Sequence, residues 1–274
     1  MSLIVLASAS GSPGVTTTAL GLALTWPRPV LLVEADPTGG SAVAAGYLRG
    51  QLVPPEAMLD LALAQQGGDL LETLARVSMT LPGSQVAFVA GVRSHEQANS
   101  LLPLWEPLAG TLRLLEDTGQ DVIVDAGRLG LAGFPLPLLE QADLALLCTR
   151  TDLVSLAGAR SWGATLKERF ERAGAATNLG LLLVGTGEPF TAREVTAVMG
   201  VPVVASVAWD PTTAAVFSHG APPPKPGIGQ RLAGRAGIDD TALVRSLRAA
   251  HSAITATIRD TTNQLSVTES GGAS

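Results

Sequence analysis

The sequence predicts a doubly wound α/β domain, in which a mostly parallel sheet is flanked by helices on both faces. Short apolar runs alternate with helical patterns along the chain, and this alternation is typical of a parallel sheet with crossover helices. The 274 residues are 46% hydrophobic and only 15% charged, which suits a sheet that is buried on both faces. We expect one domain over residues 1–265 and a disordered polar tail over residues 266–274.

The apolar runs and the helical patterns between them define the expected elements in order. Length and flanking turns favour strands for the apolar runs, which are Leu3–Ala9, Val30–Val33, Val86–Ala90, Val122–Val124, Leu144–Cys148, Gly180–Val184 and Val203–Val207. Helices are expected over Thr16–Thr25, Pro55–Gln65, Pro103–Glu116, Leu153–Ala173 and Thr191–Met199. A last helix is expected over Asp239–Gln264, because its apolar residues Leu243, Leu247, Ile254 and Ile258 fall on one face.

The first strand runs into a glycine-bearing turn that opens a helix, and such a turn forms an anion site from backbone N–H groups. The turn reads Ser10-Gly11-Ser12-Pro13-Gly14-Val15-Thr16. The residues that would contact a bound phosphate are Gly11, Ser12, Gly14, Val15, Thr16 and Thr17. An ordinary connection between a strand and a helix, without a ligand, is the alternative.

This turn and other segments in the same order resemble the ParA/MinD family, ATPases whose deviant phosphate loop reads K-G-G-x-G-K-[ST]. The segment VLLVEADPTGG (30–40) resembles the family's strand that ends in D-x-D-P-Q-G. The segment DVIVDAGR (121–128) resembles its Walker B strand. The segment GLLLVGTG (180–187) resembles the family's strand that often ends in an asparagine that reads the base. The segment 199–222 resembles the family segment that follows this strand. The resemblance implies a P-loop NTPase-like fold over most of the chain.

The resemblance also implies a set of site residues. Glu34 and Asp36 stand at the two acids that follow the second strand, and Asp125 stands at the metal-side acid. These three would be the catalytic acids if the protein is active, whereas Thr16, Asp36 and Asp125 would hold Mg²⁺ only together with a nucleotide.

Several residues depart from the family pattern. Ser10 and Val15 occupy the positions of both loop lysines, Pro13 removes one backbone donor, Arg128 stands where proline is usual, and Gly185 replaces the asparagine. Only Lys167 and Lys225 are lysines in the whole chain. A phosphate-binding lysine stabilises the charge that develops during phosphoryl transfer. We therefore expect a degenerate site, a pseudo-ATPase that binds ATP or ADP with Mg²⁺ at low affinity if at all.

The function implied is that of a positioning or scaffolding protein in chromosome partitioning, septum placement, or pilus or secretion-machine localisation. A slow or partner-assisted ATPase of the same family is one alternative, and a pure protein-interaction module is another. We expect a homodimer and a protein partner of the positioning, secretion or pilus system.

Charge and composition exclude other classes of protein. The net charge of −6 argues against strong nucleic-acid binding, although arginines gather at positions 231, 235, 245, 248 and 259. Cys148 is the single cysteine, and His95, His219 and His251 are dispersed, so no metal-ligand spacing occurs. No apolar run approaches the ~20 residues of a membrane span, and the last ten residues carry no basic charge for an anchor. We expect a cytoplasmic protein that its partners recruit to the membrane or the nucleoid.

Overall fold

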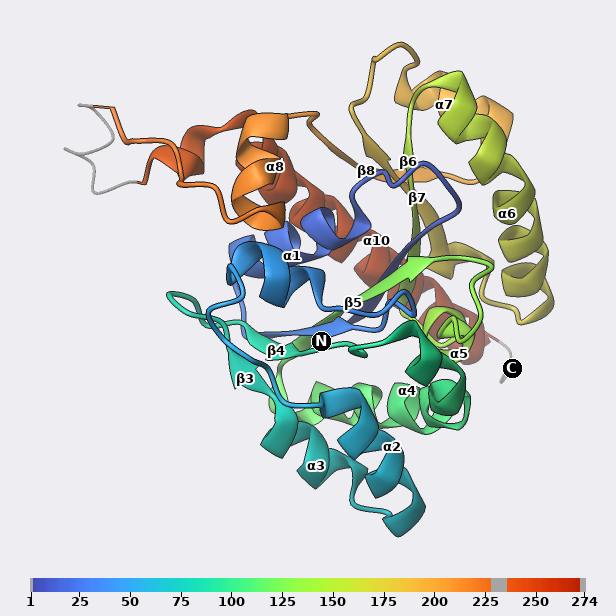
Figure 1. Ribbon diagram of the computed structural model, residues 1–274. Coiled ribbons are helices and arrows are strands. Elements are labelled where there is room, and N and C mark those ends of the chain that lie inside the picture. The colour runs from blue at the N-terminus through green and yellow to red at the C-terminus, as the bar shows by residue number, and fades with distance from the viewer. Residues whose placement is uncertain (1, 228–235, 272–274) are drawn as a thin grey trace.

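The computed structural model describes residues 2–227 and 236–271, and it is built on an eight-stranded sheet in the order β3-β4-β2-β5-β1-β6-β7-β8 (Figure 1). The strands are β1 (Leu3–Ser8), β2 (Val30–Glu34), β3 (Met79–Thr80), β4 (Ala87–Val89), β5 (Asp121–Arg128), β6 (Leu144–Arg150), β7 (Leu179–Val184) and β8 (Val203–Val207). All neighbouring strands are parallel except β3, which pairs antiparallel with β4. The predicted doubly wound, mostly parallel sheet is confirmed.

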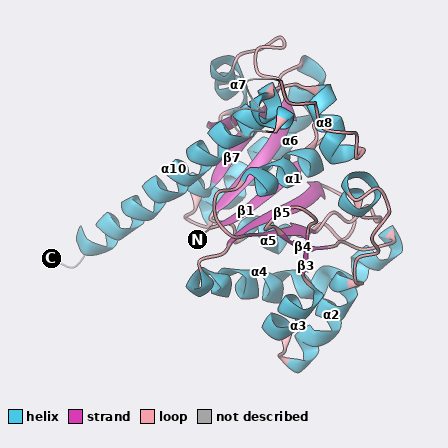
Figure 2. Ribbon diagram, turned by 90° about the vertical axis from the view of Figure 1, so that its left-hand side faces the viewer, coloured by secondary structure: helices cyan, strands magenta, loops and turns pink. Residues whose placement is uncertain are grey.

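The helices cover both faces of this sheet (Figure 2). They are α1 (Val15–Thr25), α2 (Ala57–Gly67), α3 (Leu70–Val77), α4 (Trp105–Leu114), α5 (Leu136–Glu140), α6 (Leu153–Arg172), α7 (Ala192–Met199), α8 (Pro211–Ser218) and α10 (Ala242–Gly271). Shorter turns are the π-helical η1 (Val43–Tyr47) and the 3₁₀ segments η2 (His95–Leu104), η3 (Leu115–Thr118), η4 (Ala176–Asn178) and η5 (Gly237–Asp240).

The two faces of the sheet form two separate cores, as the alternation of side chains along a strand requires. In β1, Leu3, Val5 and Ala7 pack with helices α2 to α7. Ile4 and Leu6 point to the other face and pack with α1, α8 and α10. Because both faces of β1 are buried, the loop that follows it emerges at a fixed place on the carboxyl edge of the sheet.

Helix α10 packs its predicted apolar stripe against the domain. Leu243, Leu247, Ile254 and Ile258 are all at most 9% exposed. The helix begins at Ala242 rather than Asp239, because a 3₁₀ turn precedes it. It also continues to Gly271 instead of ending at Gln264, and its far part extends beyond the body (Figure 2). Residues 272–274 of the expected disordered tail lie outside the described part of the chain.

Further differences separate the observed elements from the expected ones. Strand β3 is only two residues long, too short for a hydrophobic pattern to indicate it. The helix expected over Pro103–Glu116 begins at Trp105, and Pro103 lies in the preceding 3₁₀ segment. Helices α3, α5 and α8 have no counterpart among the expected helices.

Candidate functional site

The loop between β1 and α1 lies at the carboxyl edge of the sheet, where doubly wound folds bind ligands. Gly11, Ser12 and Gly14 have positive φ angles of 73°, 43° and 98°. Such left-handed turns point consecutive N–H groups towards one side. No side chain caps the first turn of α1, so its first N–H groups remain available to an anion.

The two positions at which the family has lysine carry side chains that turn away from the open side of this loop. Val15 is 7% exposed and packs in the core with Ile4 and Leu6. Ser10 packs against α6, where a Cβ on Gly158 would collide with the Ser10 hydroxyl. The loop therefore presents backbone donors without a positive charge from either position.

The three predicted acids lie together, because β2 and β5 are neighbours and Glu34 pairs in register with Asp125. Asp125 is 1% exposed; its Oδ1 accepts a hydrogen bond from Gly127 N at 3.0 Å, and Oδ2 has no hydrogen-bond partner. Burial raises the pKa of Asp125 to about 7, the Thr16 hydroxyl opposes this rise, and the charges of Glu34 and Asp36 add to it.

The other buried aspartate of β5 has its polar partners within the fold. Asp121 accepts hydrogen bonds from Ser2 N at 2.8 Å and Trp26 Nε1 at 2.7 Å, and it pairs with Arg28 at 2.7 Å. This aspartate is a structural anchor. The contrast shows that Asp125, with an unpaired oxygen beside Thr16, is the β5 carboxylate with capacity for a further ligand.

Glu34 and Asp36 are held in different ways. The Glu34 carboxylate accepts hydrogen bonds from Val43 N at 3.1 Å and Gly91 N at 3.3 Å, so it ties the loop after β2 to the end of β4. Burial raises its pKa above the usual value, the Ser41 hydroxyl and these two N–H groups lower it, and the Asp36 charge raises it further. Asp36 is half-buried and lies directly against Gly127, where a Cβ would collide with its carboxylate.

Arg128 brings a positive charge to the loop from within the same chain. It ends β5 opposite Ser8 of β1, and its Nε donates a hydrogen bond to the carbonyl oxygen of Ala9 at 3.3 Å. The sequence shows only that arginine replaces the usual proline. This contact could not be found from the sequence, because it joins residues 119 positions apart through the pairing of β1 with β5.

A cavity of about 360 Å³ adjoins the loop, between Ser12–Gly14 and the segment from the end of β8 into α8. Trp209 forms part of its wall and is 46% exposed. The Arg150 guanidinium stacks over this indole at 3.6 Å from the ring centre. A Cβ on Gly185 would lie 3.2 Å from the Trp209 Cβ, so the glycine at the expected base-reading position accommodates this tryptophan. No pattern in the sequence indicates that Trp209 lies at this site, because its contacts come from distant segments.

Neither a protein-only metal site nor a membrane span is found in the described residues. No three His, Cys, Asp or Glu side chains among them are placed to hold a metal ion. Within the same residues, no helix has the length and apolar character needed to cross a bilayer. Two arginines of the group near the carboxyl end, Arg231 and Arg235, lie outside the described ranges.

A scan against protein-family models gave no match, and a search of curated proteins gave none either. Solved structures do resemble this chain. A ParA family ATPase from Chlorobium tepidum TLS has a TM-score of 0.67 at 17% identity, covering 92% of this chain and 99% of that chain. The septum site-determining protein MinD from Pyrococcus horikoshii OT3, complexed with Mg-ADP, has a TM-score of 0.63 at 17% identity, covering 93% and 96%.

A MinC:MinD cell division protein complex from Aquifex aeolicus has a TM-score of 0.59 at 15% identity and covers 93% of this chain and 96% of that chain. At these identities the likeness establishes the fold. The chain therefore has the single-domain α/β fold, with a mostly parallel sheet between helices, that ParA and MinD ATPases have.

Proposed function

We propose that this protein is a ParA/MinD-like positioning or scaffolding protein whose nucleotide site binds weakly and does not hydrolyse ATP. The cellular process is chromosome partitioning, septum placement, or the localisation of a pilus or secretion machine. One observation carries the proposal. The loop keeps the backbone form of a phosphate site, yet Val15 is buried in the core and Ser10 packs against Gly158.

The residues on the magnesium side fit a nucleotide complex. The unpaired Oδ2 of Asp125 lies at a buried position near the Thr16 hydroxyl, and Asp36 approaches from the neighbouring strand. Thr16, Asp36 and Asp125 would hold Mg²⁺, and the backbone of residues 11–17 would hold the phosphates. Bound Mg²⁺ neutralises charge on the phosphate oxygens. A metal ion without nucleotide lacks a complete set of ligands among the described residues.

The residues on the phosphate side fit a nucleotide complex poorly. A charge-assisted hydrogen bond contributes about 1.5–3 kcal/mol, so each missing lysine weakens binding by roughly one to two orders of magnitude. Hydrolysis depends even more on such charges, since positioning and electrostatics supply nearly all of the catalysis in phosphoryl transfer. We propose that an arginine or lysine of a partner occupies the place of the lost cation.

Calorimetry of the purified protein with ATP and Mg²⁺ tests the binding part of this proposal. We expect a Kd no tighter than high micromolar, and low-micromolar affinity would overturn the proposal. In a hydrolysis assay, turnover should not exceed that of the Thr16→Ala and Asp125→Ala variants. Val15→Lys alone should not restore turnover, because Ser10 and Pro13 still depart from the working loop.

A slow ATPase is the second candidate, and the contact between Arg128 and Ala9 favours it because it brings one cation to the loop in cis. Turnover above both controls would select this candidate. A pure interaction module is the third. It is selected if ATP does not bind and if Asp36→Ala and Asp125→Ala leave the capture of the native partner unchanged.

The partners of the protein follow from the same proposal. A solved structure of similar fold is a complex of MinD with MinC. We propose that this chain likewise forms a homodimer and binds a protein of the positioning, secretion or pilus system. Its partners would also recruit it to its place in the cell.

A further inference from the structure

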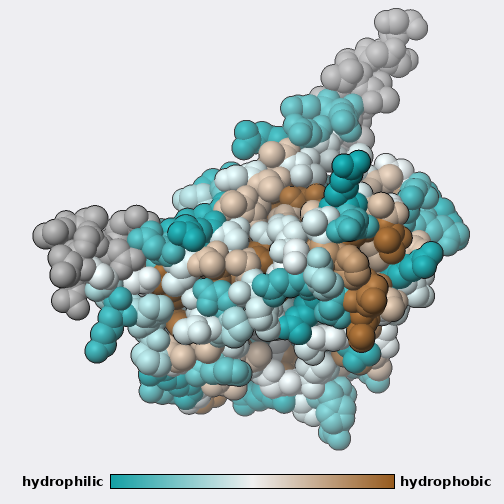
Figure 3. All heavy atoms as spheres, turned by 90° about the horizontal axis from the view of Figure 1, so that it is seen from above, coloured by the Kyte–Doolittle hydropathy of each residue, from teal (hydrophilic) through white to brown (hydrophobic). Residues whose placement is uncertain are grey.

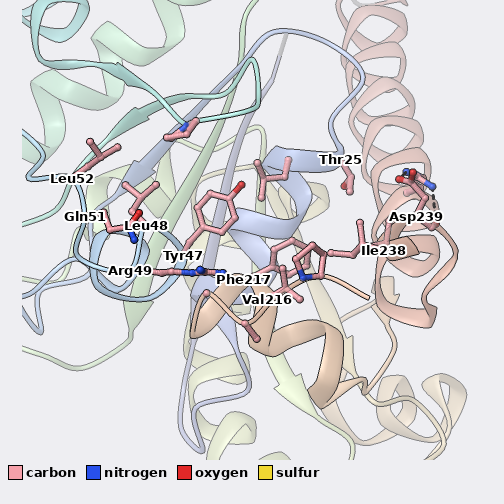
Figure 4. Close-up of a pocket in the computed structure, with 17 residues that line it drawn as sticks. Thr25, Tyr47, Leu48, Arg49, Gln51, Leu52, Val216, Phe217, Ile238 and Asp239 are labelled. Carbon is pink, nitrogen blue, oxygen red and sulfur yellow. Dashed lines mark hydrogen bonds and ion pairs between the residues drawn. The ribbon is translucent and has the colours of Figure 1, made fainter. Parts of the chain in front are cut away.

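A large cavity in the described part of the protein lies away from the loop, at the other end of α1 (Figure 4). Its volume is about 490 Å³, within the usual range for small-molecule sites. Its walls come from the end of α1, from η1 and the residues after it, from α8, and from η5 with the start of α10. The wall is mainly apolar, with Leu48, Phe217, Ile238 and Val244 contributing to it.

Arg49 enters this cavity from a strained backbone. Its φ of 54° lies in the left-handed region, which costs a residue with a side chain about 1–2 kcal/mol. The arginine stem runs along Gly220, where a Cβ would lie 2.5 Å from Cγ and 2.9 Å from Nε. Strain that the surrounding fold maintains is a reason to look for a functional role.

Two polar side chains that line the cavity, Arg49 and Tyr47, can donate hydrogen bonds to a ligand. The Arg49 guanidinium forms no ion pair or hydrogen bond with any described residue, and Figure 4 shows it extending towards Phe217. The Tyr47 hydroxyl, on a half-buried side chain, also has no hydrogen-bond partner in the described chain. Arg248 and Asp239 pair at 2.6 Å and neutralise each other. Among the described residues that line the cavity, Arg49 is therefore the charged group without an ion-pair partner.

We propose that this cavity binds a small organic anion, a carboxylic acid with an apolar body, whose carboxylate pairs with Arg49. An arginine guanidinium matches a carboxylate through two parallel hydrogen bonds. The apolar wall takes the hydrocarbon part, and the Tyr47 hydroxyl provides a second donor. This site is separate from the loop, and the proposal does not depend on whether nucleotide binds there.

Decanoate and decanol are a suitable pair of probes, because they share the apolar body and differ in charge. Binding to the full chain is measured by calorimetry. The wild type should bind one equivalent of decanoate at least about tenfold more tightly than decanol. In Arg49→Gly the affinity for decanoate should fall at least about tenfold, while that for decanol stays unchanged. This variant also relieves the left-handed strain, so its Tm should not fall.

Two further variants complete the test, one that fills the cavity and one that serves as a control. Ala221 lines the cavity, so Ala221→Trp fills the space and should abolish the binding of both probes. Arg193 is an exposed arginine on α7, and Arg193→Gly is the matched control that should leave both affinities unchanged. The proposal is overturned if decanoate does not bind, if it binds no better than decanol, or if Arg49→Gly and Ala221→Trp bind it like the wild type.

Discussion

At the scale of single residues, Asp125 decides what the site can do. It is buried on a central strand and keeps one oxygen unpaired, and its pKa is raised to about 7. The folded protein therefore holds a proton on this carboxyl that the unfolded chain releases near the ordinary aspartate pKa of 3.8. As the pH rises from about 4 to about 7, the contribution of this group lowers the free energy of unfolding progressively. Above pH 7 the loss of stability is complete and stays constant.

Asp125→Asn should remove this cost. Without ligand, the variant should be more stable than the wild type by about 2–4 kcal/mol at pH 8 and much closer to it at pH 4.5. Urea denaturation at the two pH values measures the difference, with Asp260→Asn, at an exposed position on α10, as the control. An equal difference between Asp125→Asn and wild type at both pH values would contradict the explanation.

Arg128 supports a second prediction at this scale. If its guanidinium supplies the positive charge that the loop lacks, Arg128→Ala should weaken the binding of Mg-ADP by about tenfold or more. Arg128→Lys should recover part of the loss, because the charge remains. Calorimetry measures the affinities, and Arg169→Ala, which removes an arginine paired with Glu140 on the surface, is the control. Unchanged affinity in Arg128→Ala would exclude this role.

At the scale of elements, the contact between the loop and α6 fixes the form of the site. Ser10 lies so close to Gly158 that an added Cβ would lie 2.9 Å from the Ser10 Cβ. Gly110, on α4, has nothing within 4 Å of the equivalent position. These two helical glycines form a matched pair, because alanine is the better helix former at both sites and only one site is crowded.

Gly158→Ala should therefore destabilise the protein by about 1–3 kcal/mol, because the loop must move away from α6. Gly110→Ala should instead stabilise it by about 0.5–1 kcal/mol. Chemical denaturation of both variants gives the comparison. Stabilisation by both substitutions would mean that the loop does not rest on α6 in solution.

The elements also show how far the sequence can predict this structure. The apolar runs predicted seven strands and the glycine-bearing turn, because each depends on neighbours in the sequence. Glu34, Asp36 and Asp125 are brought together as expected, since parallel strands end at one edge. The contacts of Arg128 with Ala9 and of Arg150 with Trp209 join distant segments. No local pattern indicates them, and they depend on the order of the strands.

At the scale of the whole molecule, two neighbouring apolar side chains are exposed beside the loop. Leu153 and Val154 begin α6 and are 69% and 83% exposed. The loop packs on the same turn of the helix, where a Cβ on Gly11 would lie 3.4 Å from the Ser155 hydroxyl. Figure 3 shows hydrophobic residues gathered towards one side of the molecule seen from above. Exposed apolar side chains of this kind mark contact surfaces.

We predict that the protein forms a dimer without nucleotide and that this dimer rests on Leu153 and Val154. Ser10, at the position of one loop lysine of the family, packs within its own chain, so we expect other parts of the protein surface to supply the contact. Val154→Asp should raise the dimer dissociation constant at least about tenfold, because burying an unpaired carboxylate is costly. Leu63→Asp, at a 71% exposed position on α2, should leave the dimer unchanged. Light scattering with and without Mg-ATP measures both. A monomer that dimerises only when ATP is added would refute the prediction, and equal effects of the two substitutions would place the interface elsewhere.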